Sequence, residues 1–289
     1  MNKIVEIFGL EPKHHEEEVV EAINLQQCPF SLKKCYKTRK SDPSISIGTC
    51  TIVYSHPNDK NIKVPTIICP NRLTERKQIF LDCLHLLTNH QPGNEIHLIP
   101  EVKIPGGNVD FFLVSVKDGK VKDFLGIELQ ALDTTGSIWS ERQELLKELG
   151  IIPINTEVER KTVGMNWKMT AKTILVQMHH KVETFENLNK KMVLVIQDVF
   201  LAYMQKEFKF DHLNENVDVA DSCHIHSYTL KNDQENEKLK ISLNHRLSTD
   251  ADGIGKSLGL QSEAKIELQL IINILENKIA SNNSLNLSI

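Results

Sequence analysis

Two apolar, strand-like segments that carry charged residues constrain the fold of this chain more than any other feature. Residues 109–116 (VDFFLVSV) and 123–132 (DFLGIELQAL) have the composition of strands, and the Lys-Asp-Gly-Lys sequence between them is typical of a hairpin turn. Asp110 interrupts the first segment, and Glu128 and Gln130 lie within the second. Because side chains alternate between the two faces of a strand, Glu128 and Gln130 point to the same side. The hairpin would bring Asp110 close to them.

Two interpretations of this pair of carboxylates remain open from the residues alone. Like charges held together at a sheet edge are unfavourable unless a cation lies between them. Mg²⁺ suits such a place, because it keeps several waters and binds one or two carboxylates together with a substrate phosphate. The first interpretation is a Mg²⁺ site held by Asp110 and Glu128. The alternative is that both carboxylates face solvent on a half-exposed hairpin.

The order of the other elements predicts an α/β fold. Further strands are expected at residues 95–104 and 191–197, and short strands within the irregular segment 28–70. Apolar periodicity predicts helices over residues 15–27, 74–90 (capped by Thr74), 140–149, 170–185, 198–208 and in the tail from residue 261. We divide the chain into an N-terminal segment, a core and a C-terminal extension packed on the core, at residues 1–72, 73–210 and 211–289.

Six cysteines raise the question of a second metal site. Four thiolates can surround one zinc or iron ion as a tetrahedron. Four of the cysteines lie in the first quarter of the chain: Cys28, Cys35, Cys50 and Cys69. Their spacing leaves two interpretations open, a shared metal site and scattered structural cysteines. Cys83 lies in an apolar helical pattern and is expected in the core. Cys223, His224 and His226 could bind a metal, but we interpret them as part of a strand with exposed histidines.

Composition places few limits on the partners. The chain of 289 residues has 40% hydrophobic and 25% charged residues, as ordinary globular proteins do. The formal net charge of −4 does not indicate nucleic acid, yet residues 31–40 (SLKKCYKTRK) form a basic run that is either a solvated loop or a phosphate-contacting surface. The sequence has no long apolar run and no signal-peptide pattern, so we expect no membrane contact and a cytoplasmic protein.

Several of these segments together resemble a known family. Residues 100–113 (PEVKIPGGNVDFFL), 126–137 (GIELQALDTTGS) and 69–73 (CPNRL), with the upstream cysteines, are similar to the NotI family of type II restriction endonucleases in the PD-(D/E)XK nuclease superfamily. The resemblance implies an active site of Glu101, Asp110, Glu128 and Gln130, with Mg²⁺ on Asp110 and Glu128. It also implies a structural iron or zinc ion on Cys28, Cys35, Cys50 and Cys69.

The resemblance further implies a fold and a function. The fold is a PD-(D/E)XK restriction-endonuclease-like core, a mixed central sheet flanked by helices, after an N-terminal cysteine-bound metal segment. The function is Mg²⁺-dependent hydrolysis of double-stranded DNA at a specific, palindromic site by a homodimer. Gln130 stands where the superfamily usually has lysine and would orient water or phosphate; Lys103 and Lys168 are the next candidates for the polar group. The alternatives are a non-specific or repair-type nuclease and an inactive, metal-stapled DNA-binding protein.

Overall fold

The computed structural model describes residues 2–12, 16–152, 163–233 and 238–259, together with residues 272, 273 and 277. The helix predicted in the tail from residue 261 therefore falls almost entirely outside the described residues. The elements follow in the order β1 (Ile4–Ile7), α1 (Glu16–Leu25), β2 (Thr38–Arg39), β3 (Asp42–Ser46), β4 (Thr49–Ser55), β5 (Lys63–Ile67), η1 (Pro70–Lys77), α2 (Gln78–Asp82), η2 (Leu84–Leu86), β6 (Glu95–Ile104), β7 (Gly107–Lys117), β8 (Lys120–Gln130), β9 (Thr134–Thr135), α3 (Trp139–Glu148), β10 (Gly164–Met165), α4 (Trp167–Asn187), β11 (Lys191–Gln197), α5 (Asp198–Glu207), β12 (Cys223–Asp233), β13 (Lys238–Thr249) and α6 (Ala251–Ser257).

Six strands form the central sheet, in the order β13-β12-β11-β8-β7-β6. Strand β11 runs parallel to β8 and to β12, whereas the other neighbours are antiparallel. The mixed sheet predicted from the sequence is thus confirmed. The predicted hairpin is confirmed as well: β7 and β8 are joined by Asp118 and Gly119, whose φ angles of +51° and +69° are those that a two-residue turn of type I′ requires.

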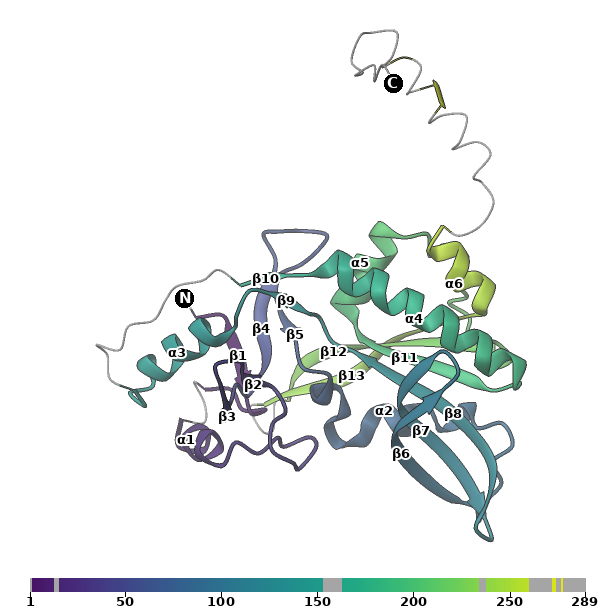
Figure 1. The fold of residues 1–289 in the computed structure, drawn as a ribbon, viewed down its shortest axis with the longest axis horizontal. Coiled ribbons are helices and arrows are strands. Elements are labelled where there is room, and N and C mark those ends of the chain that lie inside the picture. Colours follow the sequence, from purple (N-terminus) through teal and green to yellow (C-terminus); the bar gives the residue numbers. More distant parts are fainter. Residues whose placement is uncertain are drawn as a thin grey trace, which may run out of the picture.

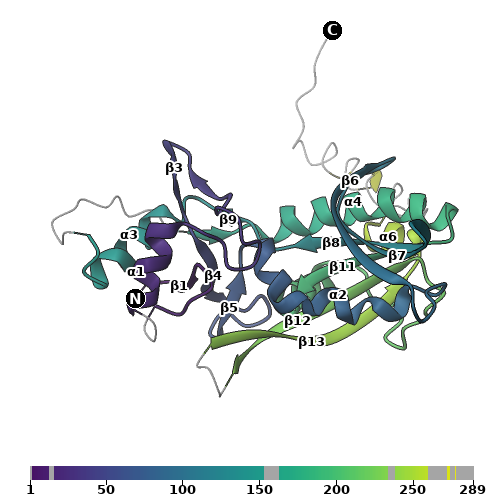
Figure 2. The same ribbon diagram turned by 90° about the horizontal axis from the view of Figure 1, so that it is seen from below.

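Helices cover both faces of the central sheet, as Figures 1 and 2 show. Helices α4, α5 and α6 lie on one face, and α2 with the 3₁₀ segments η1 and η2 lies on the other. Each face has its own apolar core. The core beneath α4 includes Val109, Phe112, Met178, Phe185 and Leu194, and the core beneath α2 includes Phe80, Leu113, Ile127, Val195 and Tyr228.

The single helix predicted over residues 74–90 is wrong. The segment is broken into η1, α2 and η2, because Arg76 and Lys77 adopt φ angles of +50° and +58°, which no right-handed helix contains. Its apolar side chains are nevertheless buried. Cys83 is fully buried among them, as predicted.

Residues 223–226 form a strand, as predicted, but their histidines are not exposed. His224 and His226 are fully buried. The reason is the place of β12 between β11 and β13, where η1, α2 and η2 cover one face; the Nδ1 atom of His226 lies 3.7 Å from the Sγ atom of Cys83. Burial, followed by the charge of Arg246, lowers the pKa of His226 to about 3.

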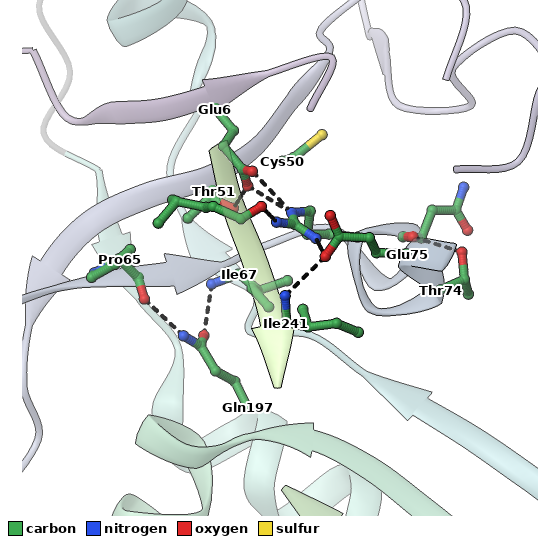
Figure 3. A network of polar contacts seen from close by, with 12 residues as sticks. Glu6, Cys50, Thr51, Pro65, Ile67, Thr74, Glu75, Gln197 and Ile241 are labelled. Atoms are coloured by element: carbon green, nitrogen blue, oxygen red, sulfur yellow. Dashed lines mark hydrogen bonds and ion pairs between the residues drawn. The ribbon is translucent and has the colours of Figure 1, made fainter. Parts of the chain in front are cut away.

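A smaller sheet, β1-β4-β5, lies beside the large one, and two polar side chains join them. The first is Gln197, the last residue of β11. Figure 3 shows its amide between two residues of β5: it donates to the carbonyl oxygen of Pro65 at 2.7 Å and accepts from the backbone N–H of Ile67 at 2.8 Å.

The second link is Arg72 of η1. Its Nε atom donates to both carboxylate oxygens of Glu6 on β1, at 3.0 and 2.8 Å. One Nη atom donates to Glu75 at 2.9 Å, and the other donates to the carbonyl oxygen of Leu239 on β13 at 2.8 Å. Glu75 in turn accepts from the backbone N–H of Ile241 at 2.8 Å, and Figure 3 shows these carboxylates gathered at the junction of the sheets.

Candidate active site

Glu128 lies in the middle of the candidate site. It is on β8, on the face that α4 covers, because its neighbours Ile127 and Leu129 take the opposite, apolar face. The side chain is buried, with the residue 7% exposed. One carboxylate oxygen, Oε1, accepts a hydrogen bond from Lys181 at 2.7 Å. The other, Oε2, is buried without a hydrogen-bond partner among the described residues, and such an orphaned acceptor is where a cation would bind.

Asp110 is held beside Glu128 by the backbone of β8. The regular pairing of β7 with β8 reaches Phe111 and Ile127, and Asp110 follows next along β7. Its Oδ2 atom accepts a hydrogen bond from the N–H of Leu129 at 2.8 Å. The predicted meeting of Asp110 and Glu128 is present in the structure.

The two carboxylates raise the cost of ionisation at this point. Burial, followed by the charge of Asp110, raises the pKa of Glu128 to about 7. Burial also raises the pKa of Asp110, and the charge of Glu101 adds to this effect. The pair is therefore short of positive charge even with Lys181 present, which is the condition under which a divalent cation binds carboxylates.

Glu101 interrupts β6 where that strand passes Asp110. The strands pair Pro100 with Phe111 and Val102 with Val109, so Glu101 lies across from Asp110. Its φ angle of +53° is rare for a residue with a side chain and distorts the strand. Backbone strain of this kind gathers at functional sites. The side chain of Glu101 is exposed to solvent at the rim of the site.

Gln130 occupies the same face of β8 as Glu128, two residues further on. Its amide Nε2 donates to the carbonyl oxygen of Ala131 at 2.5 Å. Neither alternative lysine has an evident role in the structure: Lys103 and Lys168 are both exposed, on β6 and in the first turn of α4.

The cation beside the carboxylates is Lys181 of α4, which the sequence interpretation missed. It is 3% exposed and extends from the helix face that carries Met178, Val182 and Phe185. The sequence did contain a signal for Lys181, because a lysine within the apolar stripe of an amphipathic helix is unusual. The turn between β6 and β7 rests on α4 at this point: the Thr184 hydroxyl donates to the carbonyl oxygen of Pro105 at 3.0 Å.

The donors present fit Mg²⁺. Two carboxylates, one with an unpartnered oxygen, are what this ion takes from a protein when a substrate phosphate and waters complete its shell. In the part of the chain that the structure describes, no group of three or more His, Cys, Asp or Glu side chains is placed to hold a metal ion.

The four-thiolate site predicted from the sequence is not supported. Cys28, Cys35, Cys50 and Cys69 are all buried, but they do not form a metal-binding group among the described residues. Two of the thiols instead lie against backbone carbonyl groups: the Sγ atom of Cys35 is 4.0 Å from the carbonyl oxygen of Lys37, and that of Cys50 is 3.4 Å from the carbonyl oxygen of Gly48.

The thiols nevertheless influence one another. A hydrogen bond from Cys50 lowers the pKa of Cys69 to about 6 against the opposing effect of burial, and the backbone N–H groups of Asn71 and Arg72 assist. Burial raises the pKa of Cys35, and the charges of Cys69 and Cys28 add to it. The four side chains thus lie in one region, with one of them favoured as a thiolate.

Carboxylates gathered on two neighbouring strands of a mixed sheet, β7 and β8, beside a cation define a candidate site for divalent-metal chemistry on phosphates. The family model for the restriction endonuclease NotI matches residues 19–241, most of the chain, so the chain belongs to this family of restriction endonucleases. No curated protein matches it. Membership confirms the prediction of a site-specific enzyme that acts on double-stranded DNA. No helix among the described residues is long and apolar enough to cross a membrane.

Proposed function

We propose that this chain is a type II restriction endonuclease that hydrolyses phosphodiester bonds at a palindromic site in a Mg²⁺-dependent reaction. The observation that carries the proposal is the pair of Asp110 and Glu128, with the free Oε2 atom of Glu128. We further assign the central sheet and its helices to the PD-(D/E)XK superfamily, because the two strands of the hairpin supply Asp110 and then Glu128 in the order that the motif requires. The domain limits at residues 72 and 210 and a cytoplasmic location stay predictions.

Each residue of the site has a separate role in the proposed reaction. When bound, Mg²⁺ polarises the scissile phosphate and lowers the pKa of a bound water. Asp110, fixed by the N–H of Leu129, and Glu128, through its Oε2 atom, would hold the ion. Glu101 would hold a second ion or orient water around the first. Gln130 would position the water, which attacks the phosphorus in line as the 3′ oxygen leaves; in that role its amide turns away from Ala131.

The decisive experiment is to incubate the purified protein with long unmethylated DNA and Mg²⁺ and to map the fragment ends. We expect a defined set of fragments with one sequence at every end. A continuous smear would indicate the non-specific nuclease instead, and DNA binding without cutting would indicate the inactive DNA-binding protein.

Isosteric variants test the assigned carboxylates without removing their structural contacts. Asp110→Asn keeps an acceptor for the N–H of Leu129, and Glu128→Gln keeps an acceptor for Lys181. Both should bind DNA in Ca²⁺ and fail to cut it in Mg²⁺. Glu95→Gln is the matched control, because Glu95 lies on β6 with its side chain exposed and paired with His97 at 2.9 Å. Cutting by Asp110→Asn at the wild-type rate would refute the assignment.

A palindromic target calls for a dimer with two-fold symmetry. We therefore propose that the enzyme acts as a homodimer, and light scattering of the complex with its cognate duplex would measure the mass directly. One chain per duplex at saturation would rule this out.

A structural iron or zinc ion on Cys28, Cys35, Cys50 and Cys69 also stays a proposal. Its support is the shared, buried location of the thiols and the two backbone donors to Cys69. Binding would require Cys35 and Cys50 to turn away from their carbonyl partners. Elemental analysis should find one ion per chain in the wild type and in Cys83→Ser, and none in Cys69→Ser. Equal metal content in the wild type and in Cys69→Ser would exclude the site.

A further inference from the structure

Lys181 supplies a positive charge to the candidate site, whereas Gln130 on β8 supplies none. Glutamine carries no charge, and the amide of Gln130 donates to its own strand. Lys181 reaches the same face of β8 from α4 and contacts Glu128 at 2.7 Å. We propose that Lys181 is a catalytic residue whose ammonium group binds a non-bridging oxygen of the scissile phosphate, an inference that rests on the proposed nuclease function.

A purely structural role explains the position of Lys181 poorly. Taking an ammonium group out of water costs several kcal/mol, and a buried ion pair is often no more stable than apolar residues of similar volume. Met178, Val182 and Phe185 surround Lys181 on the same helix face, so an apolar side chain would extend that core without this cost. The pair of Lys181 and Glu128 therefore points to a use beyond packing.

The charge of the inner part of the site, which leaves out the exposed Glu101 at the rim, favours a phosphate only when Lys181 is included. Asp110, Glu128 and Lys181 sum to −1 when all are ionised, because two carboxylates face one ammonium. A bound Mg²⁺ changes the sum to +1, which matches the single negative charge of a phosphodiester. Without Lys181 the same cluster would be neutral and would attract the phosphate less.

The hydrogen bonds of the pair leave room for both ligands. Lys181 uses Oε1 of Glu128, so the unpartnered Oε2 atom stays available to Mg²⁺. An ammonium group has three donors, and the bond to Glu128 uses one of them. Lys181 can therefore bind a phosphate oxygen while it still orients Glu128.

The turn between β6 and β7 packs on α4 beside the stem of Lys181. A Cβ atom added to Gly107 would lie 3.5 Å from the Cε atom of Lys181, and one added to Gly106 would lie 3.0 Å from the carbonyl oxygen of His180. The φ angles of Gly106 and Gly107 are +95° and +130°, and residues with a side chain rarely adopt such values. The two glycines thus let the turn pack closely on α4 beside the lysine.

Lys181→Gln tests the role of the charge, because glutamine keeps a donor for Glu128 and removes the positive charge. We expect single-turnover cleavage at saturating enzyme and saturating Mg²⁺ to fall about 10²-fold, comparable to the loss of one positioned donor. Lys181→Arg should recover part of this loss. DNA affinity in Ca²⁺ should fall far less than the cleavage rate, because one phosphate contact among many is lost, and the sites cut should not change. Lys172→Met, at an exposed position of the same helix, is the matched control and should cut at the wild-type rate.

Sulfur substitution at the scissile phosphate separates contact with substrate from support of Glu128. One of the two phosphorothioate diastereomers should be cleaved more slowly than the phosphodiester by the wild type. Lys181→Gln should not show this slowing, because its contact with that phosphate oxygen has already been removed. Equal slowing in both proteins for both diastereomers, or a defect in Lys181→Gln that higher Mg²⁺ abolishes, would overturn the proposal. Wild-type cleavage in the same series verifies the nuclease function separately; its absence would overturn both.

Discussion

The buried guanidinium of Arg72 gives a sharp test of how the two sheets are held together. Arg72 and Glu6 each have only 1% of their side chains exposed, and Arg72 donates to two carboxylates and one backbone carbonyl group. In Arg72→Met the apolar stem remains, whereas Glu6 and Glu75 lose their cation. Breaking a buried ion pair by removing one partner costs about 3–5 kcal/mol.

Such a loss is large against the total stability of a protein, which is about 5–15 kcal/mol. Urea unfolding followed by circular dichroism should therefore show a midpoint lowered by more than about 1 M at an m-value of about 3 kcal/mol/M. Adding Glu6→Gln to Arg72→Met should restore part of the loss, because it removes one of the unpaired charges.

Arg76→Met provides the matched control on the same segment. The side chain of Arg76 is 63% exposed and lies 4.0 Å from Asp233, so its loss should cost less than about 1 kcal/mol. Equal stability of Arg72→Met and Arg76→Met would show that the buried network does not hold the sheets together, and the reasoning would fail.

Three further predictions follow from the site and the core. Gln130→Ala should slow single-turnover cleavage about 10²-fold without changing the sites cut, and an unaltered rate would make Gln130 a bystander. Gly126→Ala should destabilise the fold by about 1–3 kcal/mol in urea unfolding, because the added Cβ would lie 2.5 Å from the sulfur of Met192; Gly255→Ala, with its nearest neighbour at 3.7 Å, should be neutral or stabilising. Burial lowers the pKa of His226 to about 3, so below pH 6.5 the unfolded chain binds more protons at this residue than the folded chain does. The free energy of unfolding should therefore fall from pH 6.5 toward pH 3, and this pH dependence should be weaker in His226→Leu.

Local signals in the sequence predict the hairpin and the carboxylates well. The Asp118-Gly119 turn and the alternation along β8 involve residues close in the sequence, so the pairing of the two strands and the shared face of Glu128 and Gln130 follow from local signals. The exact register does not, because an irregularity between Ser115 and Val116 shifts the pairing by one residue before it reaches the contact of Asp110 with the N–H of Leu129.

Features that depend on distant partners are not visible in the sequence. Lys181 meets Glu128 across 53 positions of chain, through the packing of α4 on β8, and no spacing rule connects them. His224 and His226 looked like surface residues until the placement of β12 inside the sheet buried them. The break at Arg76 and Lys77 lies among polar residues that precede Ile79, the first apolar position of the helical pattern, so the periodicity carries no information about it.

The distortion of β6 at Glu101 also affects how the chain behaves at high concentration. Strand β6 forms one edge of the central sheet and exposes Ile96, Leu98 and Ile99, a composition that invites pairing with the edge of another molecule. Pro100 has no N–H to donate, and the left-handed backbone of Glu101 bends the strand directly after it. Both features disfavour the addition of a second chain along this edge. The backbone that carries an acidic residue to the candidate site thus also disfavours edge-to-edge association of the folded protein.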